Sequence, residues 1–230
     1  GDVGTMRILR GELVRIKVFA RPFALNRYFK NNSEPKLHIG CGSNLKEGWL
    51  NADKFSANAD IYLNALRRMP FKANTFKFIH MEHLLEHIPI DRVPFFLSEC
   101  LRILKPGGCI RIIVPDLDIY VKKYYEGEKE FFQPIIEKFK CKIEQNKDQL
   151  VNKYKYWLVR TPGAVFISRA VRRFYHHNWM YDFETLRVAL EEVGFKKATK
   201  QQFQESEFDE FKTMDNPDRE YESLYVDAVK

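Results

Sequence analysis

The sequence lacks long hydrophobic runs. No stretch approaches the roughly 18 consecutive apolar residues that a membrane-spanning helix needs. The segment from Gly1 to Leu13 has no apolar core followed by a small-residue cleavage site, so it does not resemble a signal peptide. These absences predict a cytoplasmic protein without a transmembrane segment.

Cysteine is scarce and scattered. The four cysteines are Cys41, Cys100, Cys109 and Cys141, and none forms a Cys-x-x-Cys pair. A disulfide framework and a structural zinc site therefore both lack support. Scattered thiols are typical of a reducing, cytosolic compartment.

The composition is that of an ordinary globular protein with a basic N-terminus. The 230 residues are 45% hydrophobic and 30% charged, which suits one domain, or one domain with an insertion. The net charge is +7. Seven of the basic residues fall before position 31: Arg7, Arg10, Arg15, Lys17, Arg21, Arg27 and Lys30. This charge indicates either an anionic partner or a solvated helix face, and without a Lys/Arg run or interleaved aromatics nucleic acid is the less favoured partner.

Apolar patterning divides the chain into an arm and a main domain. Residues 1–35 read as a basic helical arm broken near Pro22 and closed by a polar segment. Residues 36–230 form the main domain, with a lysine-rich, aromatic helical insertion or cap at about 120–175. Strands are expected at 36–40, 49–53, 61–63, 76–81, 109–114, 198–203 and 223–229, and helices at 92–104 and 183–193. The alternation predicts an α/β fold with a mixed, mainly parallel sheet covered by helices on both faces. Ligands of such sheets bind at the carboxyl ends of the strands.

The first expected strand runs into Gly40-Cys41-Gly42. Glycines at such a turn let a ligand approach the main chain, although a Gly-x-Gly pair alone is weak evidence. A dinucleotide fingerprint would place a third glycine at Leu45, and P-loop residues are also missing. Asp53 ends the second strand, where a carboxylate either accepts hydrogen bonds from a ribose diol or caps a turn.

Two further blocks complete an ordered pattern. Met69-Pro70-Phe71 leads to Leu85-Glu86-His87-Ile88, and Leu101 to Leu104 is followed by Lys105-Pro106-Gly107-Gly108 and a strand. In this order and spacing, residues 36–117 resemble class I S-adenosylmethionine-dependent methyltransferases. The segments Leu37 to Gly42, His177 to Leu186 and Glu222 to Val226 are similar to an uncharacterised bacterial subgroup of that family. The resemblance implies a Rossmann-like, seven-stranded fold, S-adenosylmethionine as methyl donor and S-adenosylhomocysteine as product.

The resemblance also implies roles for particular residues. The turn Gly40-Cys41-Gly42 would pass under the methionine and ribose of the cofactor, and Asp53 would hold the ribose hydroxyls. The remaining cofactor contacts would come from Asn64, Ala65 and Leu66 at the adenine and from Met81 and Glu82 at the methionyl group. His38 stands where the family often has an acid, which changes or removes a contact to the cofactor's amine. Only about six residues separate Gly42 from Trp49, so the first helix must be reduced to a turn.

The string His83-Leu84-Leu85-Glu86-His87 offers an alternative chemistry. It matches the His-x-x-Glu-His pattern of inverted zinc peptidases, and two histidines four apart on a helix share a face. A zinc-dependent hydrolase is therefore an alternative, although no third ligand can be located and the favoured reading has no metal. A second alternative is a binding module that keeps the fold without catalysis.

A hydroxyl acceptor needs a general base, and the candidates are His83, His177 and Asp116. No Asn/Asp-Pro-Pro-Tyr/Phe string follows the fourth strand, which argues against amino methylation of nucleic acids. A glycan or small metabolite is the favoured acceptor. The aromatic residues of the insertion would either stack on sugar rings or form its core.

Overall fold

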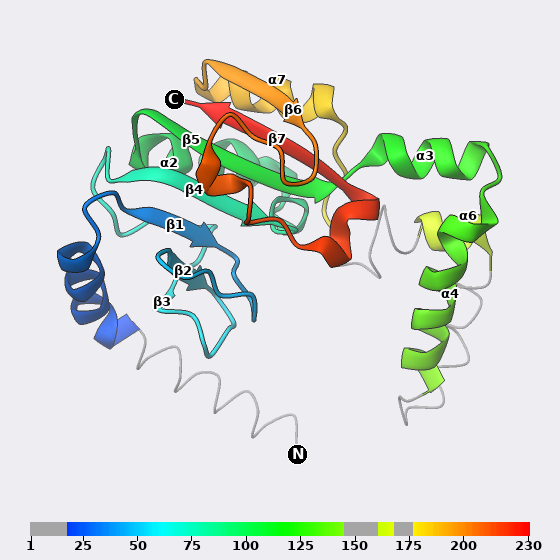
Figure 1. Cartoon of the computed structure of the whole chain (residues 1–230), viewed down its shortest axis with the longest axis horizontal. Coiled ribbons are helices and arrows are strands. Elements are labelled where there is room, and N and C mark those ends of the chain that lie inside the picture. Colours follow the sequence, from blue (N-terminus) through cyan, green and yellow to red (C-terminus); the bar gives the residue numbers. More distant parts are fainter. Residues whose placement is uncertain (1–17, 145–160, 168–176) are drawn as a thin grey trace.

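The computed structural model describes residues 18–144, 161–167 and 177–230 around a seven-stranded sheet (Figure 1). The strand order is β3-β2-β1-β4-β5-β7-β6. Neighbouring strands from β3 across to β5 are parallel, whereas β7 is antiparallel to both β5 and β6. The strands are β1 Lys36–Ile39, β2 Leu50–Asp53, β3 Ile61–Tyr62, β4 Phe76–Glu82, β5 Leu104–Pro115, β6 Lys197–Gln201 and β7 Ser223–Val229. The predicted mixed, mainly parallel sheet is confirmed, and β5 starts earlier than expected.

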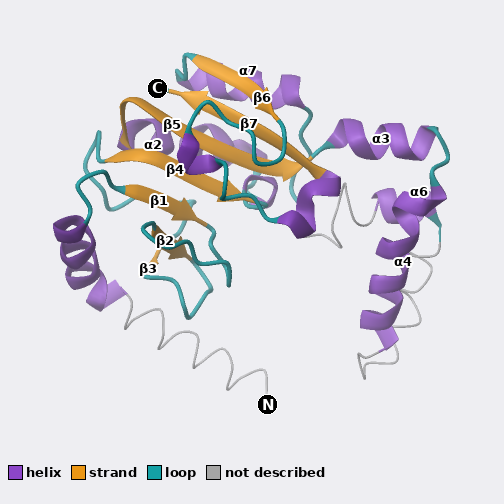
Figure 2. Ribbon diagram, viewed as in Figure 1, coloured by secondary structure: helices purple, strands orange, loops and turns teal. Residues whose placement is uncertain are grey.

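One face of the sheet is apolar and carries two helices, α2 (Val93–Ile103) and α7 (Phe183–Val193), which also contact each other (Figure 2). Apolar side chains of the strands and of both helices form the main core. The ends of α7 follow from its sequence. Asp182 caps the first turn by accepting a hydrogen bond from the backbone of Thr185, and Gly194 ends the helix in the left-handed region at φ +107°.

The opposite face carries a row of polar side chains. The register aligns Asn51, His38, His80, Arg111 and Asp227 on five adjacent strands, and all five are buried. Successive residues of a strand point to opposite faces, so this row lies on the face opposite to the side chains of Ile39, Ile79 and Ile110. We call these five residues the polar row.

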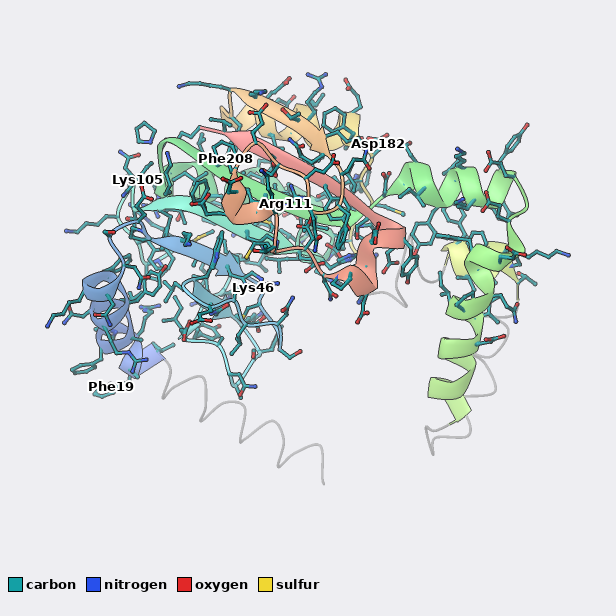
Figure 3. All side chains as sticks on the ribbon, in the orientation of Figure 1. Phe19, Lys46, Lys105, Arg111, Asp182 and Phe208 are labelled. Carbon is teal, nitrogen blue, oxygen red and sulfur yellow. The ribbon has the colours of Figure 1, made fainter. Side chains whose placement is uncertain are left out.

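The segment between β6 and β7 covers the polar row. It holds two short 3-10 helices, η6 (Asp209–Phe211) and η7 (Pro217–Glu222). Arg111 donates to the backbone oxygens of Gln202 and Glu205 in this segment and to the carboxylate of Asp215. Figure 3 labels Arg111 and Phe208, which lie where this segment crosses the sheet. The cover is thus attached to the sheet by hydrogen bonds as well as by packing.

Three helices lie between β5 and α7 in the described part of the chain. They are α3 (Leu117–Tyr125), α4 (Lys129–Glu144) and α6 (Pro162–Val165), and α4 and α6 extend away from the sheet (Figure 1). A separate apolar cluster holds these helices together, formed by Tyr120, Phe132, Ile135, Ile136, Val165 and Met180. Among the aromatic residues of this part of the chain, Tyr120 and Phe132 are core, whereas Tyr125 is 90% exposed. Tyr154, Tyr156 and Trp157 lie outside the described residues.

The described part of the N-terminal arm is one continuous helix over residues 18–31. The predicted break near Pro22 is wrong, because a proline removes a single N–H donor and the helix continues past it. Ala24, Leu25, Tyr28 and Phe29 pack against the main core, and their helical spacing explains why this segment lies on the domain. The basic residues before position 18 lie outside the described residues. No helix in the described part of the chain is both long and apolar enough to cross a membrane.

Candidate active site

A cavity of about 380 Å³ lies at the carboxyl ends of β1 and β4. The strand order reverses between these two strands, and ligands of open α/β sheets bind at such a switch point. Its volume lies within the range of small-molecule sites. The lining residues are His38, Gly40, Cys41, Gly42, Ser43, Asn44, Glu82, His83, Asn216 and Arg219.

A larger cavity of about 790 Å³ lies elsewhere, between helix 18–31 and residues 45–51. It is lined by no residue of the predicted site and does not lie at the switch point. The smaller cavity is therefore the better candidate active site, because it combines the expected position with the predicted residues.

The glycine turn forms one wall of the candidate site. Gly40 and Gly42 have φ angles of +73° and +53°, in the left-handed region that favours glycine. A Cβ on Gly40 would lie 3.1 to 3.3 Å from the side chain of Leu84, whereas one on Gly42 would meet nothing within 4 Å. No helix follows the turn, and residues 41–49 form turns and coil, as predicted from the short connection.

Asp53 holds the glycine turn from the end of β2. Its Oδ2 accepts a hydrogen bond of 3.0 Å from the N–H of Gly42, and its Oδ1 accepts from the N–H groups of Phe55 and Ser56. A carboxylate has about four acceptor positions, so one remains for a ligand hydroxyl. Asp53 adjoins the cavity through Gly42 without lining it.

Four other predicted cofactor residues do not line this cavity. Asn64 accepts a hydrogen bond from the N–H of Leu66, while Ala65 and Leu66 pack against the main core. Met81 is fully buried in that core. Its neighbour Glu82 does line the cavity, because successive residues of β4 point to opposite faces.

Glu82 and His83 form the wall opposite the glycine turn. Burial raises the pKa of Glu82 above its ordinary value. Glu82 Oε1 accepts a hydrogen bond from the N–H of Asn216, and His83 Nε2 lies 3.0 Å from Ser223 Oγ. His83 also has φ +50°, an unusual backbone conformation for a histidine that occurs at functional sites.

Besides Ser43 and Asn44, which directly follow the glycine turn, sequence reasoning missed the lining residues Asn216 and Arg219. Both come from the segment between β6 and β7, and Arg219 pairs with Glu222. They belong to no recognisable motif, since only the folding of this segment over the polar row brings them to the cavity. The sequence contains no signal that would have found them.

His38 lies deep in the candidate site as part of the polar row. Its Nδ1 lies 3.1 Å from Asn51 Oδ1, and its ring packs against that of His80 with centroids 5.0 Å apart. Burial lowers the pKa of His38 to about 4, so the imidazole is neutral at pH 7. A neutral imidazole supplies no negative charge where an acid would.

Asp116, one of the predicted bases, is engaged elsewhere. It begins α3, where Oδ1 accepts a hydrogen bond from the N–H of Asp118, and Oδ2 lies 3.4 Å from Lys200 Nζ. Burial raises the pKa of Asp116 above its ordinary value. Asp116 does not line the cavity, and its contacts are those of a helix cap.

His177, another predicted base, lies beside the segment that follows β4. Its Nε2 is 3.8 Å from Glu86 Oε1, and its ring centroid is 4.9 Å from that of His87. Burial of Glu86 opposes its ionisation, but His83, His87 and His177 together outweigh that effect and lower the pKa of the carboxyl. His177 therefore joins this cluster and does not line the cavity.

The zinc-peptidase reading of His83 to His87 requires a correction. These residues do not form one α-helix, because only Leu85–His87 is helical, as the single 3-10 turn η1. A 3-10 turn and the left-handed backbone of His83 do not place residues four apart on a common face. The side chains that come together as candidate metal ligands are Glu86, His87 and His177.

A mainly parallel sheet with a glycine turn and a cavity at its switch point defines an α/β protein of the Rossmann-like class. A family model described as "Methyltransferase domain" matches residues 20–200. The chain therefore belongs to the methyltransferase-domain family, and the predicted class of enzyme is confirmed. The finer resemblance to one bacterial subgroup stays a prediction.

Several solved structures with a similar arrangement are described as methyltransferases, all at low sequence identity. A SAM-dependent methyltransferase from Archaeoglobus fulgidus is 18% identical with a TM-score of 0.47, covering 94% of this chain and 93% of its own. A Thermotoga maritima protein described as a "possible histamine N-methyltransferase" is 15% identical with a TM-score of 0.45, covering 85% and 82%. Phosphoethanolamine N-methyltransferase 2 of Haemonchus contortus, in complex with S-adenosyl-L-methionine, is 13% identical with a TM-score of 0.41, covering 86% and 48%. These similarities are too low to assign an acceptor to this chain. No curated protein sequence matches it.

Proposed function

We propose that this protein transfers a methyl group from S-adenosylmethionine to a glycan or small-metabolite acceptor at the cavity between β1 and β4. The observation that carries the proposal is the cavity of about 380 Å³ between the glycine turn and Glu82, at the switch point of the sheet. Family membership supplies the reaction class.

The residues at the cavity fit the chemistry of this cofactor. Gly40 and Gly42 line the cavity with backbone atoms, and the position of a Cβ on Gly42 is open space, so a ligand can contact the backbone directly there. Glu82 faces the cavity as an acceptor for an amine, and Asp53 keeps one acceptor position for a ribose hydroxyl. When bound, S-adenosylmethionine supplies a methyl group on a positively charged sulfur.

His83 is the candidate base for a hydroxyl acceptor. Among the three predicted bases it alone lines the cavity, whereas Asp116 caps α3 and His177 contacts Glu86. Imidazole has the ordinary pKa nearest neutrality, which suits removal of a proton as a methyl group is received. Its ring nitrogens contact Ser223 Oγ (Nε2, 3.0 Å) and Glu86 Oε1 (Nδ1, 3.3 Å), so an acceptor hydroxyl would have to displace Ser223 from Nε2 to pass its proton to the ring. An amine acceptor would need less help from a base.

The compartment remains a prediction. Cys100 and Cys109 are buried free thiols, which supports the predicted cytoplasmic location. The basic N-terminal segment is proposed to attract an anionic acceptor or surface, with nucleic acid the less favoured partner.

The test is a thermal-shift titration with S-adenosylmethionine and S-adenosylhomocysteine. At a ligand concentration of about 100 times Kd, binding adds roughly 2.7 kcal/mol, which raises Tm by roughly 5–10 °C. Asp53→Asn is expected to weaken binding, because an amide keeps one acceptor oxygen but loses the charge. The exposed Asp91→Asn is the matched control and is expected to bind like the parent. No shift at millimolar ligand, or equal shifts in both variants, would contradict this site.

A further inference from the structure

Glu86 is a fully buried carboxylate surrounded by imidazoles. Its Oε1 lies 3.3 Å from His83 Nδ1, 3.7 Å from His87 Nε2 and 3.8 Å from His177 Nε2. Neither carboxylate oxygen of Glu86 has a hydrogen bond of good geometry within the part of the chain that the structure describes. An ionised carboxylate without water needs a positive partner. Because three imidazole nitrogens surround Glu86 Oε1, the positive partner is either a proton on one of these imidazoles or a metal cation bound among them.

We propose that Glu86, His87 and His177 bind a divalent cation of the zinc type. One ligand atom from each of these side chains lies within 4.8 Å of the other two. Metal bonds of about 2.0–2.2 Å in tetrahedral geometry place neighbouring ligand atoms roughly 3.3–3.6 Å apart. The two separations from Glu86, 3.7 and 3.8 Å, reach that range after small side-chain movements. Two imidazoles and one carboxylate are donors that suit zinc.

The cluster has one open side. The side chains of Glu86 and His177 are 0% and 1% exposed, whereas His87 is 28% exposed. Solvent therefore reaches the cluster past His87, and three protein ligands leave a fourth position for water or for an acceptor atom. A closed structural site would bury all of its ligands.

The surrounding contacts hold the ligands in position. His83 Nδ1 approaches the same Glu86 oxygen, and an outer group of this kind orients a ligating carboxylate. The N–H of Asn178 donates to the backbone oxygen of Glu86, and Asn178 Nδ2 donates to that of His87, each at 2.7 Å. The ligands thus come from two chain segments already joined by backbone hydrogen bonds, and His83 lies between the cluster and the cavity.

The experiment measures metal binding directly and independently of methyl transfer. Full-length protein treated with a chelator is titrated with Zn²⁺ by calorimetry and with Co²⁺ by visible absorption, which reports tetrahedral coordination. We expect one equivalent of each ion to bind. His87→Gln removes the partly exposed ligand and is expected to weaken Zn²⁺ binding by about 100-fold. Mutation of outer-shell partners costs roughly 10- to 100-fold, and loss of a direct ligand should reach the upper end of that range. Asp91→Asn removes a nearby exposed charge and is expected to leave the affinity unchanged.

His177→Gln provides the second test, on the other segment, with circular dichroism of the chelated protein to check folding. Loss of Zn²⁺ binding in both histidine variants, with folding retained in His87→Gln, supports the site. No Zn²⁺ uptake by the parent, or parent-like affinity in both variants, overturns it and leaves protons as the partner of Glu86. Binding of S-adenosylmethionine in the same samples reports on the proposed function separately, because none of Glu86, His87 and His177 lines the cavity.

Discussion

Replacing Arg111 with methionine is expected to destabilise the protein and disturb the candidate site together. The guanidinium is fully buried, binds Asp215 through Nε and Nη2, and reaches Asp227 through Nη1 at 2.9 Å. Methionine fills much of the volume but leaves both carboxylates buried without their cation. Removing one partner of a buried ion pair costs about 3–5 kcal/mol, against a total stability of about 5–15 kcal/mol.

Urea unfolding followed by circular dichroism measures this loss. For a chain of this length the expected loss corresponds to a fall in Tm of roughly 6–20 °C. Arg187→Met is the control, because Arg187 pairs with Glu184 and Glu191 on the surface, where such pairs contribute up to about 1 kcal/mol. If Arg111→Met costs no more than Arg187→Met, the buried network does not support the fold as argued here.

The pH dependence of the Arg111→Met variant gives a second check. Burial already raises the pKa of Asp227 in the intact chain, and loss of the arginine is expected to raise it further. A carboxyl whose folded pKa lies above its unfolded value gains stability as the pH falls through the folded pKa. The difference in unfolding free energy from the parent is therefore expected to be smaller at pH 5 than at pH 8.

Three further predictions concern single residues. Gly40→Ala is expected to destabilise the protein more than Gly48→Ala in urea unfolding, because both have positive φ but only Gly40 has a close neighbour, Leu84; equal losses would contradict the contact. His38 is expected to titrate near pH 4 in NMR. Its lowered pKa corresponds to about 3 kcal/mol of unfolding free energy, which is present above pH 6.5 and lost as the pH falls toward 4. A titration near pH 6.5 would refute its burial. Asp182→Ala removes the cap of α7 and is expected to cost about 1 kcal/mol in thermal unfolding, with an unchanged Tm counting against the cap.

The sequence predicted the parts of the fold that depend on local pattern. The β-prone run from Cys109 to Val114 lies within β5, and the helix predicted at 183–193 has those bounds as α7. The cavity wall of Gly40 to Gly42 was also foreseeable, since glycine reports a backbone requirement directly. These features share short-range causes.

Features that depend on contacts between distant residues were not predictable. Asn216 and Arg219 reach the cavity only because Arg111 binds the preceding segment, about a hundred positions away along the chain. The role of His177 likewise depends on its meeting Glu86, which no spacing rule reveals. The predicted helix break at Pro22 is wrong for a related reason. Packing of the helix against the core stabilises it by more than the loss of one backbone hydrogen bond costs.

The polar row has a consequence for how this sequence can change over time. Within the row, His38 contacts Asn51 and Arg111 binds Asp227, and Arg111 also binds Asp215 in the segment above, so a substitution at Arg111 leaves Asp215 and Asp227 with unmatched charge. Relatives are therefore expected to replace these three residues together rather than one at a time, in contrast to the interchangeable aliphatic side chains of the other face. On the hydrogen-bonded face of the sheet, substitutions would then occur in groups of interacting residues, whereas on the apolar face they would occur at single positions.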